Sequence, residues 1–201
     1  MNEQERLWQG AFGNHYHLRN EFVDRRTFWE LIIANIDFFG GSIAPIKSVL
    51  EVGAGKGENL VALRELIPEC CFTGAEINSL AAEIMRGKGF SVLEGAANSV
   101  LPSGGAYDLV ITRGFLIHVP SEDLCFTLKN LYAVSSRYIC IAEYYSPVRR
   151  EISYRGHAQA LWTDDYTKRL MDLFPKLKLM AYAFCYHIDG GDDLTWFLLE
   201  K

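Results

Sequence analysis

Three glycines at alternate positions are the residues of this sequence best suited to chemistry. Gly53, Gly55 and Gly57 follow the apolar run 49–52, and a helix-like segment begins at Glu58. Glycine admits positive φ angles and lets a ligand approach the backbone closely. A glycine turn after a buried strand therefore predicts a ligand crevice at the carboxyl edge of an open α/β sheet, and a nucleotide-like ligand in it.

Three other interpretations fit part of this pattern. A dinucleotide site requires G-x-G-x-x-G, whereas the glycines here alternate. A phosphate-binding P-loop requires Lys and then Ser or Thr after its last glycine, but Glu58 and Asn59 stand there. A plain tight turn between a strand and a helix remains open.

The E-x-G-x-G-x-G spacing from Glu51 to Gly57 resembles motif I of the class I S-adenosylmethionine-dependent methyltransferases. In that superfamily a second strand ends in an acidic residue that binds both ribose hydroxyls, and here the apolar run 71–76 ends in Glu76. A carboxylate suits a vicinal diol because it offers two acceptor oxygens. The alternative for Glu76 is a solvated carboxylate that opens the following helix, since acids are favoured in first turns.

Length and composition limit the class of protein. The 201 residues are 49% hydrophobic, which predicts one globular domain with a full core. The formal net charge of −5 and the lack of a long Lys/Arg block argue against nucleic acid as a partner. The longest apolar stretch, 31–39, is too short to span a bilayer and no basic-then-apolar leader is present, so we expect a cytoplasmic protein with no membrane partner. The five cysteines contain no C-x-x-C pair and are expected to be reduced core residues, with no metal site.

Apolar strands alternate with amphipathic segments along most of the chain. The predicted strands are 48–52, 71–76, 90–94, 107–112 and 137–143, and the predicted helices are 24–39, 58–66, 78–87, 121–134 and 164–173. This order predicts a parallel sheet with helices on both faces. Segments 177–186 and 194–199, joined by a glycine-rich loop, predict a terminal antiparallel hairpin.

These elements predict an α/β fold. It resembles the Rossmann-like class I methyltransferase fold, a mostly parallel seven-stranded sheet with a C-terminal antiparallel hairpin. The hairpin supports this family independently of the glycines. We expect an N-terminal helical lid segment over residues 1–40, a connector around Gly40, Gly41, Ser42 and Pro45, and the cofactor-binding domain over residues 41–201.

The fourth strand resembles methyltransferase motif IV and leads into segment 113–120. His118 is the titratable side chain best placed there to act near the reacting methyl. An imidazole of near-neutral pKa could accept a proton from an acceptor hydroxyl or ammonium. A histidine that only hydrogen-bonds the loop backbone is an equal alternative.

The adenine-binding position departs from the superfamily pattern. Ala96 stands where an aspartate often contacts the adenine amino group. We expect the backbone at Ala97 or the amide of Asn98 to replace that contact. The alternative for Asn98 is a simple turn residue.

The amino-terminal segment 7–20 resembles the opening of the methylases encoded with pseudaminic acid biosynthesis. The match consists of Trp8, Phe12, Gly13, Tyr16, Arg19 and Asn20, and segments 114–120, 142–147, 154–157 and 192–200 resemble the same group. Two departures are Tyr145, where Asn is more usual, and segment 162–166, which only loosely resembles the Lys/Arg-Asp-Phe segment of the group.

An aromatic segment with an arginine suits a lid over a cationic sulfonium cofactor. Tyr16 would offer its ring face or hydroxyl, and Arg19 would pair with the methionyl carboxylate. Trp8 and Phe12 are expected to pin the lid by burial.

A long polar and aromatic insertion, 143–157, follows the fifth strand. Its position predicts that it covers the acceptor site. The side chains suited to a polyhydroxylated or anionic substrate are Glu143, Tyr144, Tyr154, Arg155 and His157. The alternative is a surface loop with a paired charge cluster.

Together these features predict an S-adenosylmethionine-dependent N- or O-methyltransferase, acting on a small-molecule acceptor, a sugar of the nonulosonic (pseudaminic-type) acid or nucleotide-sugar pathway. The predicted cofactor-binding residues are Tyr16, Arg19, Glu51, Gly53, Ala54, Gly55, Gly57, Asn59, Glu76, Ile77, Ala97, Asn98 and Arg113. We expect a monomer or a homodimer. The alternatives are a non-catalytic S-adenosylmethionine-binding partner in a glycan biosynthesis cluster and, disfavoured by the acidic charge, an RNA methyltransferase.

Overall fold

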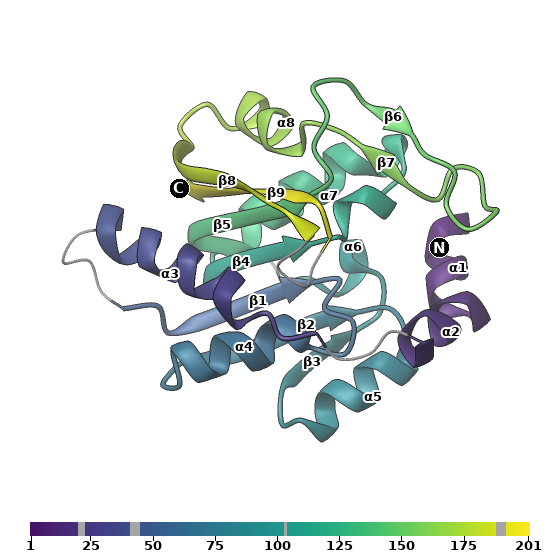
Figure 1. The fold of residues 1–201 in the computed structure, drawn as a ribbon, viewed down its shortest axis with the longest axis horizontal. Coiled ribbons are helices and arrows are strands. Elements are labelled where there is room, and N and C mark those ends of the chain that lie inside the picture. Colours follow the sequence, from purple (N-terminus) through teal and green to yellow (C-terminus); the bar gives the residue numbers. More distant parts are fainter. Residues whose placement is uncertain (20–22, 41–44, 103, 188–191) are drawn as a thin grey trace.

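A seven-stranded sheet forms the centre of the protein (Figure 1). The computed structural model describes residues 1–19, 23–40, 45–102, 104–187 and 192–201. The strand order is β3-β2-β1-β4-β5-β9-β8. The strands are β1 (Ser48–Val52), β2 (Cys71–Glu76), β3 (Ser91–Glu94), β4 (Tyr107–Arg113), β5 (Ser135–Glu143), β8 (Lys178–Cys185) and β9 (Leu194–Glu200). The first five are parallel, and β9 is antiparallel to both β5 and β8, so the predicted sheet with its terminal hairpin is confirmed.

The strand order reverses between β1 and β4. From β1 the chain runs outward through β2 to β3, then returns to place β4 on the other side of β1. In an open α/β sheet such a switch point leaves a crevice beyond the carboxyl ends of the strands, because the connections on its two sides leave in opposite directions.

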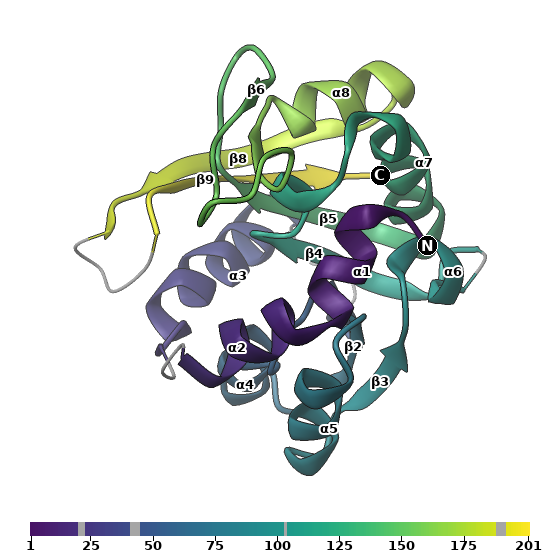
Figure 2. The ribbon, with the colours of Figure 1, turned by 90° about the vertical axis from the view of Figure 1, so that its right-hand side faces the viewer.

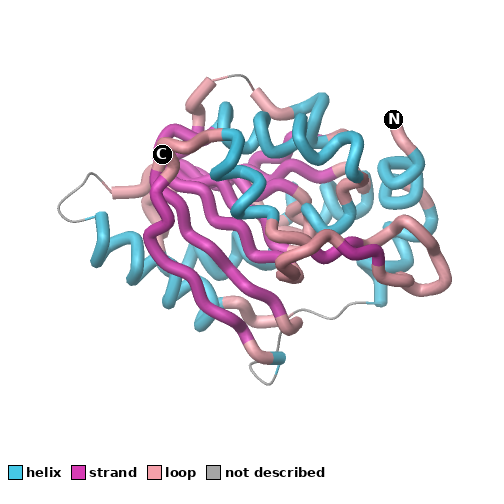
Figure 3. Tube along the Cα trace, turned by 90° about the horizontal axis from the view of Figure 1, so that it is seen from above, coloured by secondary structure: helices cyan, strands magenta, loops and turns pink. Residues whose placement is uncertain are grey.

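Helices cover both faces of the sheet (Figure 3). One face packs against α3 (Arg26–Gly40), α4 (Glu58–Leu66) and α5 (Ser79–Gly87), and the other against α7 (Ser121–Val134) and α8 (Tyr166–Leu173), with the short α6 (Ala97–Val100) beside α7. Side chains alternate along a strand, so Leu109 and Ile111 join the first core and Val110 joins the second.

The predicted lid segment divides into two parts. Helices α1 (Glu3–Gln9) and α2 (Ala11–Arg19) lie across the carboxyl edge of the sheet (Figure 2), whereas α3 buries Trp29 and Ile32 completely in the core. The predicted boundary between lid and domain stays a prediction, and most of the expected connector, residues 41–44, lies outside the described residues. The same holds for residues 188–191 of the predicted hairpin loop.

The whole connection from β5 to α8, residues 144–165, continues beyond the predicted insertion and carries structure of its own; it is called the insertion from here on. It contains a small antiparallel pair, β6 (Arg150–Glu151) and β7 (Trp162–Thr163). A short 3-10 helix, η1 (Leu116–His118), follows β4. The sequence did not predict these short elements, because tertiary packing and not a local sequence pattern determines where they form.

The cysteines are free, but the prediction that all of them lie in the core is wrong. Cys140 is buried on β5, whereas Cys71 and Cys125 are exposed. Cys71 is the first residue of β2 and Cys125 lies on the outer side of α7, so neither faces a packed layer. Within the described ranges, no helix is long and apolar enough to cross a membrane, and no group of three or more His, Cys, Asp or Glu could hold a metal ion.

Candidate active site

A cavity of about 650 Å³ lies at the carboxyl ends of β1, β2, β4 and β5. Figure 2 shows α1 and α2 crossing in front of this edge of the sheet. The predicted site residues that line the cavity are Tyr16, Arg19, Glu51, Gly53, Ala54, Gly55, Asn59, Glu76, Ile77, Ala97, Asn98, Arg113, His118, Glu143, Tyr144, Tyr154 and Arg155. Gly57 and His157 do not line it. The fold therefore brings residues from distant parts of the sequence to one place.

The glycine turn forms the floor of the cavity. Gly53, Gly55 and Gly57 have φ angles of 74°, 53° and 74°, a region that favours glycine. A Cβ at Gly53 would lie 2.6 Å from Cδ2 of Phe115, so no side chain fits there. Gly57 instead begins α4, and a Cβ on it would lie 3.0 Å from Cγ of Met85 in the core.

Glu76 ends β2 beside this turn and is buried. Its Oε2 accepts a hydrogen bond from the N–H of Gly55 at 2.7 Å, and its Oε1 accepts one from the N–H of Asn78 at 2.8 Å. Burial raises the pKa of Glu76, while the backbone N–H groups act to lower it. Each carboxylate oxygen can accept a further hydrogen bond, so the side chain suits a diol.

Glu51 and Arg113 supply two ionisable groups with unpaired atoms. Glu51 is 1% exposed, and its Oε1 accepts a hydrogen bond from Nδ2 of Asn59 at 2.6 Å. Asn59 in turn accepts a hydrogen bond through its Oδ1 from Nε1 of Trp29. Burial raises the pKa of Glu51 to about 8. Within the described part of the chain, Glu51 Oε2 and Arg113 Nε are buried without hydrogen-bond partners. The Glu51 carboxyl and the Arg113 guanidinium line one cavity, and each has an atom without a hydrogen-bond partner, so together they suit a zwitterionic ligand.

His118 lies at another part of the cavity wall. Its Nδ1 is 2.7 Å from the carbonyl oxygen of Ala160, so we assign the ring proton to Nδ1, which leaves Nε2 as an acceptor. Its ring centroid lies 4.5 Å from that of Trp8 and 5.4 Å from that of Tyr154. Burial lowers the pKa of His118 to about 4, so the prediction of a near-neutral pKa is wrong.

Glu143 holds the turn that carries His118. Its buried carboxylate accepts hydrogen bonds from the N–H groups of Phe115 at 3.2 Å, Leu116 at 3.1 Å and Ile117 at 3.4 Å. Burial raises the pKa of Glu143 to about 7. Glu143 lines the cavity, but both of its oxygens are engaged with this turn, which gives it a positioning role before any contact with a ligand.

The first two helices are fastened to the rest of the protein by polar contacts. Asn78 donates through Nδ2 to the carbonyl oxygen of Trp8 at 3.0 Å and to Oδ1 of Asn14 at 2.8 Å. A Cβ at Gly13 would lie 1.8 Å from the carbonyl oxygen of Trp8, so only glycine permits this close approach. Asn2 adds a contact from its Nδ2 to Oδ2 of Asp123 at 2.6 Å.

Several residues that line the cavity were not predicted as ligand contacts. Gln4 and His17 were not considered, and Trp8 was expected only to pack. His17 is buried close to Gly55, and burial lowers its pKa to about 4. Helical spacing could have indicated Gln4, because Gln4 and Trp8 are four residues apart on α1 and lie on the same face of it. His17 could have been considered because it is next to Tyr16 on α2. Arg19 is exposed, with its guanidinium carbon 5.5 Å from the Tyr16 ring centroid.

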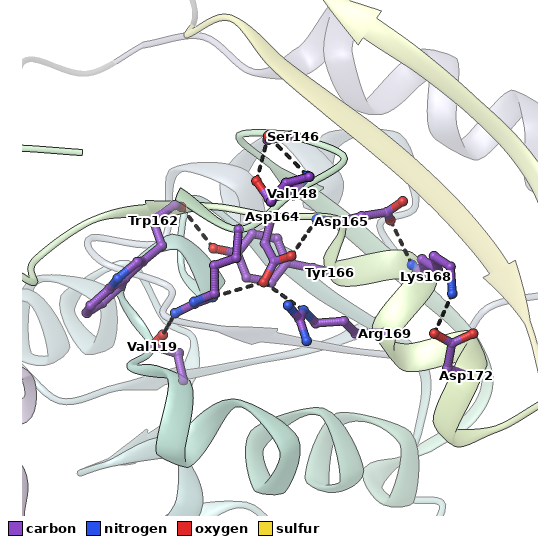
Figure 4. Close-up of polar contacts among 11 residues, drawn as sticks. Val119, Ser146, Val148, Trp162, Asp164, Asp165, Tyr166, Lys168, Arg169 and Asp172 are labelled. Carbon is purple, nitrogen blue, oxygen red and sulfur yellow. Dashed lines mark hydrogen bonds and ion pairs between the residues drawn. The ribbon is translucent and has the colours of Figure 1, made fainter. Parts of the chain in front are cut away.

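An ion cluster around the buried Asp164 holds the insertion in place (Figure 4). Asp164 is 3% exposed, and its Oδ2 accepts from Arg169 Nε at 2.7 Å and from Arg149 Nη1 at 3.1 Å. Arg149 also donates to the carbonyl oxygen of Val119 at 2.8 Å, one residue after His118. The cluster therefore links the insertion to the cavity wall. His157 lies outside the cavity, with its ring centroid 5.1 Å from that of Phe12.

Comparison with known proteins identifies a family and a fold. The family model described as "Methyltransferase domain" matches residues 22–179. A comparison with curated proteins found no match. The solved magnesium protoporphyrin IX methyltransferase of Synechocystis PCC 6803 with bound S-adenosylmethionine has a TM-score of 0.70 at 12% identity, over 100% of this chain and 98% of that one.

Two further solved structures share the fold. A SAM-dependent methyltransferase of Leishmania major has a TM-score of 0.66 at 16% identity, over 100% of this chain and 87% of that one. The mitomycin 7-O-methyltransferase has a TM-score of 0.61 at 16% identity, over 88% of this chain and 54% of that one. These likenesses confirm the predicted class I fold.

The ion cluster of the insertion makes a prediction about stability. Asp164→Asn should lower the free energy of unfolding by about 3 kcal/mol, because it leaves the partly buried Arg149 without its carboxylate. Asp172→Asn removes a carboxylate from an exposed pair with Lys168 and should cost less than about 1 kcal/mol. Urea unfolding of both variants measures the difference, and equal effects would show that the cluster does not hold the insertion.

The raised pKa of Glu51 predicts a pH-dependent stability. Between its unfolded pKa of about 4.3 and its folded pKa of about 8, the folded state keeps a proton that the unfolded state loses, so stability falls as the pH rises. Glu51→Gln removes this penalty while it keeps an acceptor for Asn59. The variant should gain at least about 1 kcal/mol over the wild type between pH 5 and pH 8, a Tm difference of about 2–4 °C.

Thermal unfolding at both pH values tests this prediction. Glu83→Gln, which changes an exposed glutamate of α5, serves as the control and should show no such gain. A Glu51→Gln variant whose advantage over the wild type is the same at pH 5 and pH 8 would contradict the raised pKa.

Proposed function

This chain belongs to the methyltransferase domain family and is an S-adenosylmethionine-dependent methyltransferase, and we propose that it methylates a nitrogen or oxygen of a small-molecule sugar of the nonulosonic acid or nucleotide-sugar type. The single observation that carries the proposal is the composition of the cavity. It combines the glycine turn and Glu76 with the unpaired polar atoms of Glu51 and Arg113.

These residues fit the three polar parts of the cofactor. The free Oε2 of Glu51 suits the ammonium of the methionine moiety, and the guanidinium of Arg113 suits its carboxylate. Arg113 is preferred over Arg19 for this contact because Arg19 is exposed and a charge-assisted hydrogen bond is stronger where water is excluded. Glu76 suits the ribose hydroxyls.

The adenine end is assigned to the backbone at Ala97. Asn98 lines the cavity, but its Nδ2 donates to Oγ1 of Thr127 at 3.1 Å and its Oδ1 accepts from Nδ2 of Asn130 at 3.1 Å. With both amide atoms engaged, Asn98 is better suited to fix α6 against α7. The backbone groups of Ala97 stay next to the cavity.

Tyrosine hydroxyls and one arginine support a polyhydroxylated acceptor. Tyr16, Tyr144 and Tyr154 line the cavity, and a tyrosine hydroxyl can both donate and accept a hydrogen bond. Arg155 lines the same wall, and its guanidinium can pair with an anionic group of the acceptor. A sugar acid would use both kinds of group.

Methyl transfer requires alignment more than acid–base chemistry. The bound cofactor supplies a methyl carbon already activated by the sulfonium, so the chain has to place the acceptor atom in line with it and exclude water. The helices α1 and α2 cover the cavity and provide that exclusion. His118 Nε2 would accept the proton that the acceptor atom loses.

Loss of one acceptor oxygen at Glu76 should weaken cofactor binding. We expect Glu76→Gln to reduce the affinity for S-adenosylmethionine by about 1.5–3 kcal/mol, because one hydrogen bond from the ribose to a charged oxygen is lost. Isothermal titration calorimetry measures the change, and Glu83→Gln is the control. Unchanged affinity would remove Glu76 from the site, and the absence of binding by the wild type would contradict the cofactor assignment.

Removal of the imidazole should affect turnover and not cofactor binding. His118→Ala should lower kcat by about 10²- to 10⁴-fold with the affinity for S-adenosylmethionine unchanged. Since burial lowers the pKa of His118 to about 4, the base stays neutral above that value, and wild-type activity should fall only as the pH drops through about 4.

Mass spectrometry provides the assay for turnover. Candidate acceptors are N-acetylneuraminic acid and nucleotide sugars, and the product gains the mass of one methyl group. An inflection of the wild-type rate near neutral pH that disappears in His118→Ala would contradict the lowered pKa. Cofactor binding without turnover on any of these sugars would contradict the proposed acceptor class.

A further inference from the structure

We propose that Gln4 and Trp8 of α1 form an acceptor-recognition pair, which binds a neutral group that both donates and accepts a hydrogen bond, such as a secondary amide. This inference rests on the proposed function, since it treats the cavity as a methyl-transfer site. It assigns a direct role to a helix that the sequence predicted only as a lid.

Both side chains carry a buried polar atom without a partner. Gln4 is 8% exposed, and its Nε2 donates to the carbonyl oxygen of Gln159, which leaves Oε1 unpaired. Trp8 Nε1 is likewise buried with no partner among the described residues. An unsatisfied buried polar atom destabilises the folded protein. Because both residues line the cavity, a ligand group is the partner that would remove this cost.

The two side chains lie on one face of α1 and near the same part of the insertion. Gln4 and Trp8 are four residues apart on α1, so they lie on the same face of the helix. Gln4 Nε2 donates a hydrogen bond to the carbonyl oxygen of Gln159, and the His118 ring donates one to the carbonyl oxygen of Ala160. Gln159 and Ala160 are consecutive residues of the insertion. Trp8 packs against His118 with a centroid distance of 4.5 Å. Gln4, Trp8 and His118 thus gather at one end of the insertion.

The backbone at this point is itself strained. Gln159 has a φ of 54°, in the left-handed region that non-glycine residues rarely adopt. Such a conformation is energetically unfavourable and is commonest at functional sites. Here the strained residue is Gln159, whose carbonyl oxygen accepts from Nε2 of Gln4 and so orients the Gln4 amide. In this orientation Oε1 of Gln4 has no partner among the described residues.

The chemistry of the pair selects a neutral group. A secondary amide can donate its N–H to Gln4 Oε1 and accept from Trp8 Nε1 through its carbonyl oxygen, and a hydroxyl can do the same. An ammonium cannot accept and a carboxylate cannot donate. The pair therefore differs from the unpaired atoms of Glu51 and Arg113, which belong to ionisable groups and suit the zwitterionic part of the cofactor.

Tryptophan side-chain NMR tests the proposal directly. We would label the protein with ¹⁵N-tryptophan, saturate it with S-adenosylhomocysteine and titrate it with N-methylacetamide into the millimolar range. The indole N–H proton of Trp8, identified by its loss in Trp8→Phe, should shift downfield and saturate. Trp196 provides an internal control, because its Nε1 is also buried without a described partner but lies outside the cavity.

Two further probes test the donor and acceptor requirement. Butanone has the shape of N-methylacetamide without the N–H and should bind several-fold more weakly, and methylammonium should leave the Trp8 signal unchanged. In Gln4→Met the difference between N-methylacetamide and butanone should disappear while affinity for S-adenosylhomocysteine stays the same. Gln9→Met, which alters an exposed glutamine of the same helix, should behave as the wild type.

The outcomes separate this proposal from the proposed function. A Trp8 signal that does not move, an equal shift of Trp196, or an unaltered preference in Gln4→Met would overturn the recognition pair, even with cofactor bound. Failure of the wild type to bind S-adenosylhomocysteine by calorimetry would instead contradict the proposed function, and the recognition pair with it.

Discussion

The parallel pairing of β1 with both of its neighbours is the constraint on which the rest of the structure depends. Val52 pairs with Ala75 of β2 on one side and with Thr112 of β4 on the other, so three strands end side by side. The chain turns away from these ends in opposite directions, which opens the crevice. Because β1 is buried on both faces and β4 pairs with β5 in the same direction, the edge cannot shift without disruption of both cores.

Three buried glutamates stand at the carboxyl ends of these strands and differ in what they bind. Glu76 holds the glycine turn and the residue before α5, and Glu143 holds the start of η1, each through backbone N–H groups. A buried carboxylate is tolerated when hydrogen bonds satisfy it. Glu51 is the exception, since one of its oxygens has no partner among the described residues. Two of the acids therefore shape the cavity, and the third is left open to a ligand.

The walls of the cavity come from segments that are far apart in the sequence. Helix α1 contributes Gln4 and Trp8, and the insertion contributes Tyr154 and the carbonyl groups next to His118. The insertion in turn depends on Asp164, whose two arginine partners link it to α8 and to the turn after η1. The sheet and its core therefore fix one side of the cavity, and two separate attachments, α1 and the insertion, form the other side.

The sequence by itself determined the parts that depend on local pattern. Alternating glycines after an apolar strand, an acid at the end of the next strand and a terminal pair of apolar segments predicted the sheet, the turn and the cavity edge, because strand periodicity and glycine conformation are local properties. Only the tertiary structure decided the state of the polar groups. The lowered pKa of His118, the full engagement of Glu143 and the unpaired atoms of Gln4 and Trp8 all follow from burial and from contacts with residues distant in the sequence. Desolvation and hydrogen bonding are set by what surrounds a group in space, and no spacing along the chain specifies that.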